Sequence, residues 1–263
     1  MSPISEKEVI EQLRRSWSER PSDGGSGDPL AAPPVRSLSE ALSEDSLALI
    51  VEPKRATAVR GVINPNLDIA QVARECAGAG ATAISIVTES TLSHGSIEDL
   101  RVARAACSLP LVARDYVVHV GRVRELRAAG ADALLFPVVA FLDEDDLDEE
   151  QDLHHIVDSA HRLGMDVVLS VRSEQELAIA LETDCEIVNI DNRDDDGRID
   201  VERTFELLSG VPVGKTVISE SVAKAEEVAS LHRAGVDALL LDEGHVDGDL
   251  AGALAVFNDL TLD

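Results

Sequence analysis

Eight short apolar runs, each followed by a stretch with helical periodicity, constrain the fold of this chain more than any other feature. Runs that are apolar at nearly every position are typical of strands buried on both faces, and such strands form parallel sheets covered by helices. Eight such units in 263 residues fit a closed (β/α)8 TIM barrel better than an open doubly wound sheet. The expected strands are residues 47–51, 83–88, 109–113, 133–138, 166–171, 186–190, 213–219 and 238–241, and the expected helices are 68–79, 96–106, 120–129, 149–163, 173–181, 201–208, 223–234 and 249–257.

The turn after the first strand argues against a dinucleotide-binding sheet, because no Gly-x-Gly-x-x-Gly pattern follows residue 51. Ahead of the barrel, residues 5–17 place apolar side chains on one stripe of a helix, which we expect to act as a lid or cap. Residues 21–34 are rich in Gly, Ser, Asp and Pro and predict a linker or a mobile loop. We therefore expect an N-terminal helix plus flexible segment over residues 1–44 and one barrel domain over residues 45–263.

The charge of the chain excludes some classes of partner. Fifty acidic residues against 23 basic ones give a net charge of −27, which repels the phosphates of nucleic acids and anionic membrane surfaces. Only four of the basic residues are lysines, and this acidic, lysine-poor composition is typical of adaptation to high salt. Cys76, Cys107 and Cys185 lack paired spacing and read as reduced core thiols. Since no signal-like N-terminus or membrane-length apolar run is present, the sequence predicts a cytoplasmic protein.

The residues just past each apolar run are polar. Glu52 and Lys54 follow the first run two residues apart, so both point to the same side of that strand. One such pair could simply be an ion pair that closes a strand, but the carboxyl ends of barrel strands are also where active sites form. The other polar strand-end residues are Ser85, Thr88, Glu89, Arg114, Asp115, Ser170, Arg172, Asp191, Asn192, Arg193, Glu220, Ser221, Asp242 and Glu243.

Five strand-end strings resemble motifs of the indole-3-glycerol phosphate synthase family, in that family's order and spacing. They are Glu52-x-Lys54-Arg55; Ser85-Ile86-Val87-Thr88-Glu89 followed by Gly95-Ser96; Arg114-Asp115-Tyr116; Asn192-Arg193-Asp194; and Ser219-Glu220-Ser221. The resemblance spans roughly residues 45–260, and the N-terminal helix resembles that family's extension. It implies a barrel of the tryptophan-biosynthesis lineage and a carboxy-lyase reaction. In that reaction, a phosphorylated carboxyphenylamino-deoxyribulose closes to an indole ring with loss of carbon dioxide and water.

The resemblance also implies roles for individual residues. The chemistry needs a cation that holds a carboxylate, groups that move protons, and a phosphate clamp. The expected catalytic residues are Glu52, Lys54, Arg114 and Asp191, and the expected substrate-binding residues are Ser85, Glu89, Asn192, Arg193 and Ser221. We expect no metal and no cofactor. We also expect a monomer or weak homodimer whose small-molecule ligand binds at the C-terminal face of the barrel.

Several positions depart from the family's pattern. Arg114 stands where the family has a lysine general acid, and a guanidinium binds carboxylates well but is a poor proton donor. Ser170 replaces the family's second catalytic glutamate, and Asp191 replaces an asparagine. On the phosphate side, the pair Asp242-Glu243 replaces Gly-Ser, and two carboxylates repel a phosphate.

These departures leave three hypotheses. The chain retains the family's own reaction, or it is an altered enzyme that acts on a less phosphorylated aromatic or carboxylate-bearing ligand. In the third hypothesis it is a non-catalytic paralogue that binds a metabolite. The sequence does not choose between the last two.

Overall fold

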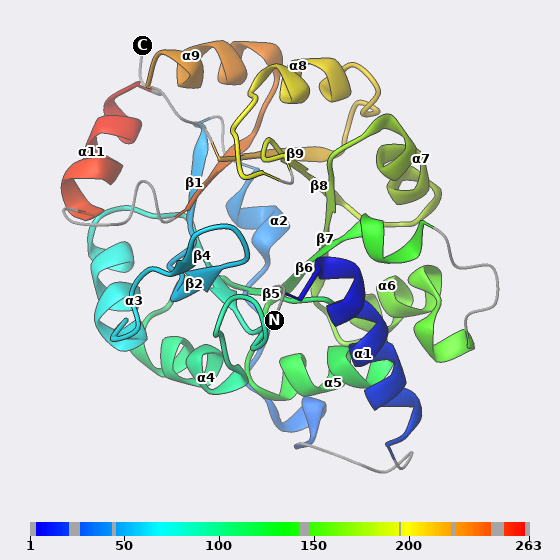
Figure 1. Ribbon diagram of the computed structural model, residues 1–263. Helices are drawn as coiled ribbons and strands as arrows, with labels where there is room; N and C mark the ends of the chain where they lie inside the picture. Colours follow the sequence, from blue (N-terminus) through cyan, green and yellow to red (C-terminus); the bar gives the residue numbers. More distant parts are fainter. Residues whose placement is uncertain are drawn as a thin grey trace.

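The chain forms a closed barrel of eight parallel strands, seen end-on in Figure 1. The computed structural model describes residues 4–20, 27–43, 46–142, 148–194, 196–221, 225–242 and 250–260. The barrel strands are β1 (Ala48–Val51), β4 (Ala83–Val87), β5 (Leu111–Arg114), β6 (Ala133–Pro137), β7 (Asp166–Val171), β8 (Ile187–Asp191), β9 (Thr216–Glu220) and β10 (Ala238–Leu241). Strand β1 pairs with both β4 and β10, which closes the ring.

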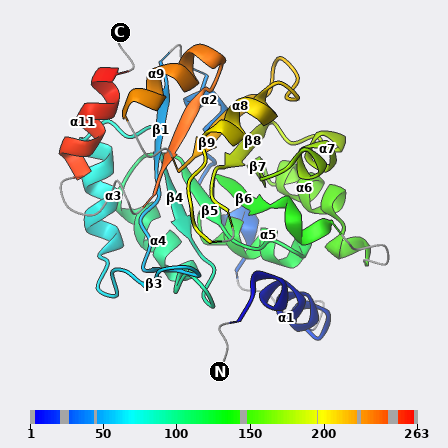
Figure 2. The same ribbon diagram turned by 45° about the horizontal axis from the view of Figure 1, so that its top comes forward.

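Helices cover the outside of the barrel, and each barrel strand is followed by one of them (Figures 1 and 2). The outer helices are α3 (Ile69–Gly78), α4 (Ile97–Ala106), α5 (Val120–Ala128), α6 (Leu153–Arg162), α7 (Glu174–Glu182), α8 (Glu202–Leu208), α9 (Ala225–Ala234) and α11 (Leu250–Leu260). Two helices precede the barrel, α1 (Glu6–Ser18) and α2 (Leu38–Ala41), and the 3-10 turns are η1 (Pro29–Ala31), η2 (Val138–Phe141) and η3 (Glu149–Gln151). The predicted (β/α)8 barrel with an N-terminal helix is therefore confirmed.

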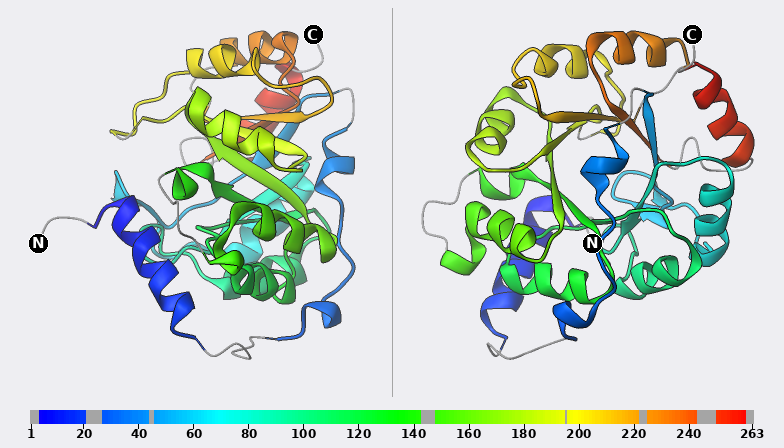
Figure 3. Two further views of the ribbon diagram at one scale, coloured as in Figure 1. Left: turned by 90° about the vertical axis from the view of Figure 1, so that its right-hand side faces the viewer. Right: turned by 180° about the vertical axis from the view of Figure 1, so that it is seen from behind.

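Helices α1 and α2 lie at opposite ends of the barrel (Figure 3). Helix α1 begins with a capping box in which Ser5 and Glu8 bond each other's backbone amides. Its far end is fixed by Trp17, whose ring stacks on His119 at 5.1 Å, and by Arg14, which donates to the Ala140 carbonyl at 2.6 Å. Helix α1 thereby runs across η2 and α5 from the mouth of the barrel, which is the end where the barrel strands have their C-termini.

Helix α2 closes the end of the barrel opposite the mouth. Leu38 and Leu42 are buried there with the inward-facing apolar residues of the strands. The carboxylate of Asp166, at the start of β7, accepts hydrogen bonds from the backbone of Leu38 at 2.7 Å and of Ser39 at 3.1 Å. A second and larger apolar layer lies between the strands and the outer helices. The barrel interior is therefore apolar at its lower end, where α2 lies, and its polar side chains lie at the mouth.

Some element boundaries differ from the predicted ones for local reasons. The strand expected from residue 213 begins at Thr216, because Gly214 has a φ of 99° and the preceding turn leaves Val213 fully exposed. The helix expected from residue 149 begins at Leu153, where the Asp152 side chain caps it. The sequence pattern gave no sign of the hairpin formed by β2 (Ala56–Thr57) and β3 (Gly61–Val62), which follows β1.

Part of the Gly/Pro-rich segment is bound to the barrel. Residues 21–26 lie outside the described residues, and arginines of α4 and α5 bind the chain at the end of the segment. Arg104 donates to the Pro34 carbonyl at 2.6 Å and Arg127 to the Pro33 carbonyl at 2.5 Å. Among the described helices, none is long and apolar enough to cross a membrane.

Candidate active site

The alternation of side chains along each strand determines which residues line the mouth. Alternate residues of a strand face the same side, so the residue two positions past an inward apolar residue also faces inward. The inward apolar residues near the middle of the strands are Ile50, Ala83, Val112, Leu135, Val168, Ile187, Ile218 and Leu240. Two positions on, the sequence places Glu52, Ser85, Arg114, Pro137, Ser170, Asn189, Glu220 and Asp242. Seven of these eight residues are polar, and they form one ring above the apolar interior.

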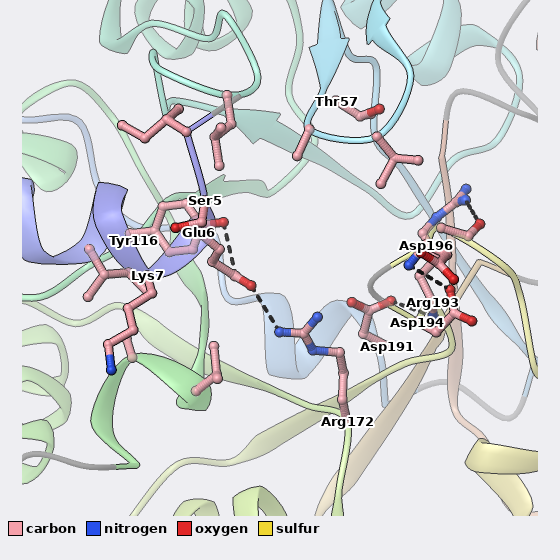
Figure 4. A pocket seen from close by; sticks show the side chains of 18 of the residues that line it. Ser5, Glu6, Lys7, Thr57, Tyr116, Arg172, Asp191, Arg193, Asp194 and Asp196 are labelled. Carbon is pink, nitrogen blue, oxygen red and sulfur yellow. Dashed lines mark hydrogen bonds and ion pairs between the residues drawn. The ribbon is translucent and has the colours of Figure 1, made fainter. Parts of the chain in front are cut away.

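A cavity of about 920 Å³ opens above this ring (Figure 4). The β2–β3 hairpin, the first turn of α1 and the loop after β8 supply its upper walls. An adjoining lobe of about 160 Å³ reaches down between Ser170, Arg172 and Asp191. Cavities of this size are typical of small-molecule sites.

Glu52, Lys54 and Ser85 form the first group of the site. Glu52 is fully buried, and its Oε1 atom lies 2.8 Å from Lys54 Nζ. The Ser85 hydroxyl donates to the other carboxylate oxygen of Glu52 at 2.5 Å. The two strand-end charges that the sequence pairs by spacing therefore contact each other, and Lys54 lines the cavity.

Arg114 and Glu220 form the second group. Arg114 Nη1 lies 2.8 Å from Glu220 and 3.4 Å from Glu52. The Asn189 amide donates to Glu220 at 2.7 Å and to the Ser170 hydroxyl at 2.9 Å. Burial works against the charge of Arg114, but the two glutamates outweigh it and raise its pKa. Arg114 therefore stays a cation and cannot serve as a proton donor near neutral pH.

Asp191 is a carboxyl group of the mouth with a raised pKa. Burial, and then the charge of Glu220, raise its pKa from 3.8 to about 6, although Arg114 opposes the shift. Burial also acts to raise the pKa of Glu220, yet Arg114 and Lys54 outweigh burial and lower it. Neighbouring carboxyl groups whose pKa values are pushed apart are a recurrent sign of acid–base chemistry. Figure 4 shows Asp191 directed into the cavity.

Arg193, Ser221 and Asp242 form a third group, just past the ends of β8, β9 and β10. Arg193 makes an ion pair with Asp242 through Nη2, and its Nε lies 3.0 Å from Ser221 Oγ. The Ser221 hydroxyl donates to the same Asp242 oxygen at 2.7 Å. Ser221 has a φ of 62°, in the left-handed region that is rare outside glycine, and such strain clusters at functional sites. The guanidinium of Arg193 and the hydroxyl of Ser221 thus both donate to the buried carboxylate of Asp242.

Arg172 and Tyr116 form the fourth group, together with Glu6 from α1 (Figure 4). Arg172 Nη2 lies 3.1 Å from Glu6 Oε2, and the Tyr116 hydroxyl donates to Glu6 Oε1 at 3.0 Å. Burial and the nearby Glu6 raise the pKa of Tyr116, so its hydroxyl stays protonated. The N-terminal helix is thereby tied to two walls of the cavity.

Two of the predicted substrate-binding residues make structural contacts. Glu89 accepts hydrogen bonds from the backbone amides of Leu92 and Ser93, both at 2.9 Å, and so closes the loop after β4. The amide of Asn192 is buried and donates to Ser219 Oγ at 3.0 Å, while Thr204 donates to its oxygen at 2.9 Å. Glu89 still lines the smaller lobe.

Reasoning from the sequence missed Asn189 and Glu6. Asn189 lies inside an apolar run, and counting two positions from Ile187 would have found it. Glu6 belongs to a helix more than a hundred residues from its partners, and no local pattern signals that contact. Within the described ranges, no group of three or more His, Cys, Asp or Glu side chains could hold a metal ion.

Comparisons with known proteins place this geometry in context. A family model described as indole-3-glycerol phosphate synthase matches residues 9–251. The chain is 36% identical over 215 residues to indole-3-glycerol phosphate synthase 2 of Streptomyces coelicolor, covering 81% of each chain. It is 34% identical over 242 residues to indole-3-glycerol phosphate synthase of Chlorobium phaeovibrioides, covering 90% of each. Among solved structures, 3-hexulose-6-phosphate synthase of Salmonella typhimurium superposes with a TM-score of 0.64 at 14% identity, covering 82% of this chain and 99% of that one, and so shares the fold.

Proposed function

The chain belongs to the indole-3-glycerol phosphate synthase family, and on that premise we propose that its mouth binds a small aromatic carboxylic acid that lacks a phosphate group. We further propose that Asp191 exchanges a proton with this ligand. The observation that carries the proposal is the carboxylate of Asp242. This carboxylate already accepts the hydrogen bonds of Arg193 and Ser221. The family resemblance implies that the phosphate clamp lies on this side of the mouth.

The charge balance of the mouth supports a ligand of low charge. The cations Lys54, Arg114, Arg172 and Arg193 are held by the carboxylates of Glu52, Glu220, Glu6 and Asp242. Asp191 adds a fifth carboxyl group beside these four pairs. A phosphorylated ligand that also carries a carboxylate would bring two or three further negative charges into this balanced ring, at an electrostatic cost.

The proton chemistry of the mouth favours an altered reaction over the family's own. The family resemblance assigns the general acid to the position of Arg114, which here remains a cation bound to two glutamates. The position of its second catalytic glutamate is Ser170, whose hydroxyl does not ionise near neutral pH. Asp191, with a pKa of about 6, populates both protonation states near neutrality and can act as either acid or base.

We expect aromatic carboxylates without phosphate to stabilise the protein. At ten times its Kd, 2-aminobenzoate should raise the midpoint of thermal unfolding by about 3–5 °C, because only ligand bound to the native state shifts that equilibrium. The family's phosphorylated carboxyphenylamino-deoxyribulose should give no comparable shift. The measurement is a thermal-shift titration at constant high salt, with benzamide as an uncharged aromatic control.

The opposite pattern would contradict the proposal. Stabilisation by the phosphorylated compound alone would show that the clamp still accepts phosphate. Formation of indole-3-glycerol phosphate that is abolished by Glu52→Gln would show that the family's reaction survives. Ligand binding without any chemical turnover, unchanged by Asp191→Asn, would support the binding-only hypothesis instead.

Replacing Asp242 by glycine should open the third group to external anions. The change removes the carboxylate that Arg193 and Ser221 both bond, so these two side chains can make charge-assisted hydrogen bonds to phosphate instead. We expect inorganic phosphate to bind about ten-fold more tightly to Asp242→Gly than to the unmodified protein, measured by calorimetry at fixed ionic strength. Glu98→Gln removes the same charge from an exposed site on α4, where the side chain is 69% exposed, and serves as the control. Equal phosphate affinity in all three proteins would disprove the role of Asp242.

A further inference from the structure

The carboxylate of Glu6 is recognised as a ligand carboxylate would be. Its two oxygens are bound by different groups, one by the guanidinium of Arg172 at 3.1 Å and the other by the hydroxyl of Tyr116 at 3.0 Å. Both donors belong to the barrel and line the main cavity as well as its smaller lobe. A guanidinium and a phenol that each bind one oxygen form a specific site for a carboxylate.

Glu6 is far more accessible to solvent than Asp242, the carboxylate that Arg193 binds. The Glu6 side chain is 34% exposed, whereas that of Asp242 is 1% exposed. The first turn of α1 is closed by Ser5 and Glu8, so the helix does not depend on Glu6 for its cap. An ion pair that is partly open to water is weaker than a fully buried one, because solvent screens the two charges.

We infer that Arg172 and Tyr116 are the seat for the carboxylate of the ligand, and that Glu6 occupies this seat until the ligand displaces it. The inference rests on the proposed function, in which the ligand carries a carboxylate. Exchange of one carboxylate for another at these two donors limits the cost of adding an anion beside Asp191 and Glu176, which also act on Arg172. The lobe of about 160 Å³ beside Ser170 and Pro137 gives the attached ring a place to lie.

Removing the charge of Glu6 should strengthen the binding of a simple aromatic carboxylate. We expect Glu6→Gln to bind benzoate about five-fold more tightly than the unmodified protein, since an amide competes poorly for Arg172. Glu19→Gln, at the exposed C-cap of the same helix, removes the same charge and should leave the affinity unchanged. Benzamide, which has the same ring without the charge, should show no difference among the three proteins. Binding is measured by calorimetry at constant high salt.

Loss of either donor should have the reverse effect. Arg172→Met should weaken benzoate binding by about ten-fold or more, and Tyr116→Phe, which keeps the ring, by several-fold. Trp17 is the only tryptophan of the chain and is stacked on His119, so its fluorescence reports whether α1 stays docked in each variant. An emission spectrum equal to that of the unmodified protein shows that an affinity change arises at the seat itself.

The outcomes separate this inference from the proposed function. Benzoate binding that is indifferent to Glu6→Gln, Arg172→Met and Tyr116→Phe overturns the seat and leaves the proposed function standing. Absence of benzoate and 2-aminobenzoate binding in every protein contradicts the proposed function and the seat with it. Tighter binding in Glu6→Gln together with weaker binding in both donor variants establishes the seat.

Discussion

Asp132→Ala is expected to lower the free energy of unfolding by about 3–5 kcal/mol. Asp132 is fully buried just before β6. Its carboxylate accepts from Arg104 at 2.6 Å and 2.7 Å, from the amide of Leu111 at 2.9 Å and from the amide of Arg36 at 2.9 Å. Alanine would leave a largely buried guanidinium and two backbone amides without their acceptor, which is the costly way to break such a network.

Urea unfolding in constant high salt measures this effect. Asp132→Asn keeps an acceptor but loses the charge, so its loss of stability should be intermediate. Asp158→Ala provides the control, because Asp158 is 55% exposed and lies 4.0 Å from Arg162 in a surface pair worth at most about 0.5 kcal/mol. If Asp132→Ala and Asp158→Ala differ by less than about 1 kcal/mol, the network around Asp132 does not hold the lower end of the barrel together.

The fold was predictable because its signal repeats. Each barrel strand carries an apolar run, and burial on both faces follows from that run alone whatever its neighbours are. Boundaries were less predictable because they depend on single turns. Nothing in the apolar run from Val213 reveals that Gly214 bends the chain, and the hairpin at residues 56–62 has too few apolar positions to show a period.

The site was predictable where the spacing along one strand decides the geometry. Glu52 and Lys54 contact each other because residues two apart share a side of the strand. The pairing of Arg193 with Asp242 was not predictable, since each side chain had several candidate partners at the strand ends and only the packed barrel selects one. The same holds for Glu6, whose partners are fixed by where α1 docks. The sequence therefore indicated most of the strand-end groups of the mouth but not Asn189 or Glu6, and the structure adds which of these groups contact each other.

Asp191→Asn is expected to stabilise the protein, and the gain should depend on pH. In the folded protein the pKa of Asp191 is raised from 3.8 to about 6, so the native state binds this proton more tightly than the unfolded chain does. The stability that the native state gains from this tighter proton binding is fully present below about pH 4 and is lost as the pH rises through about 6. Asparagine resembles the protonated form and loses nothing. The variant should therefore match the parent near pH 4 and exceed its stability by about 2 kcal/mol above about pH 7, allowing for partial solvent screening.

The same substitution tests the role of Asp191 in the site. Ionisation of Asp191 places a negative charge in the cavity beside the seat of Arg172, so the affinity of the unmodified protein for benzoate should fall several-fold as the pH rises from about 5 to about 7. Asp191→Asn should bind benzoate with little dependence on pH over this range and should lose any proton-transfer activity. Asp158→Asn, on α6, where the side chain is 55% exposed, should behave as the parent in stability and in binding. A parent protein whose stability and benzoate affinity are both flat between these pH values would show that Asp191 does not titrate there, and the acid–base assignment would then be wrong.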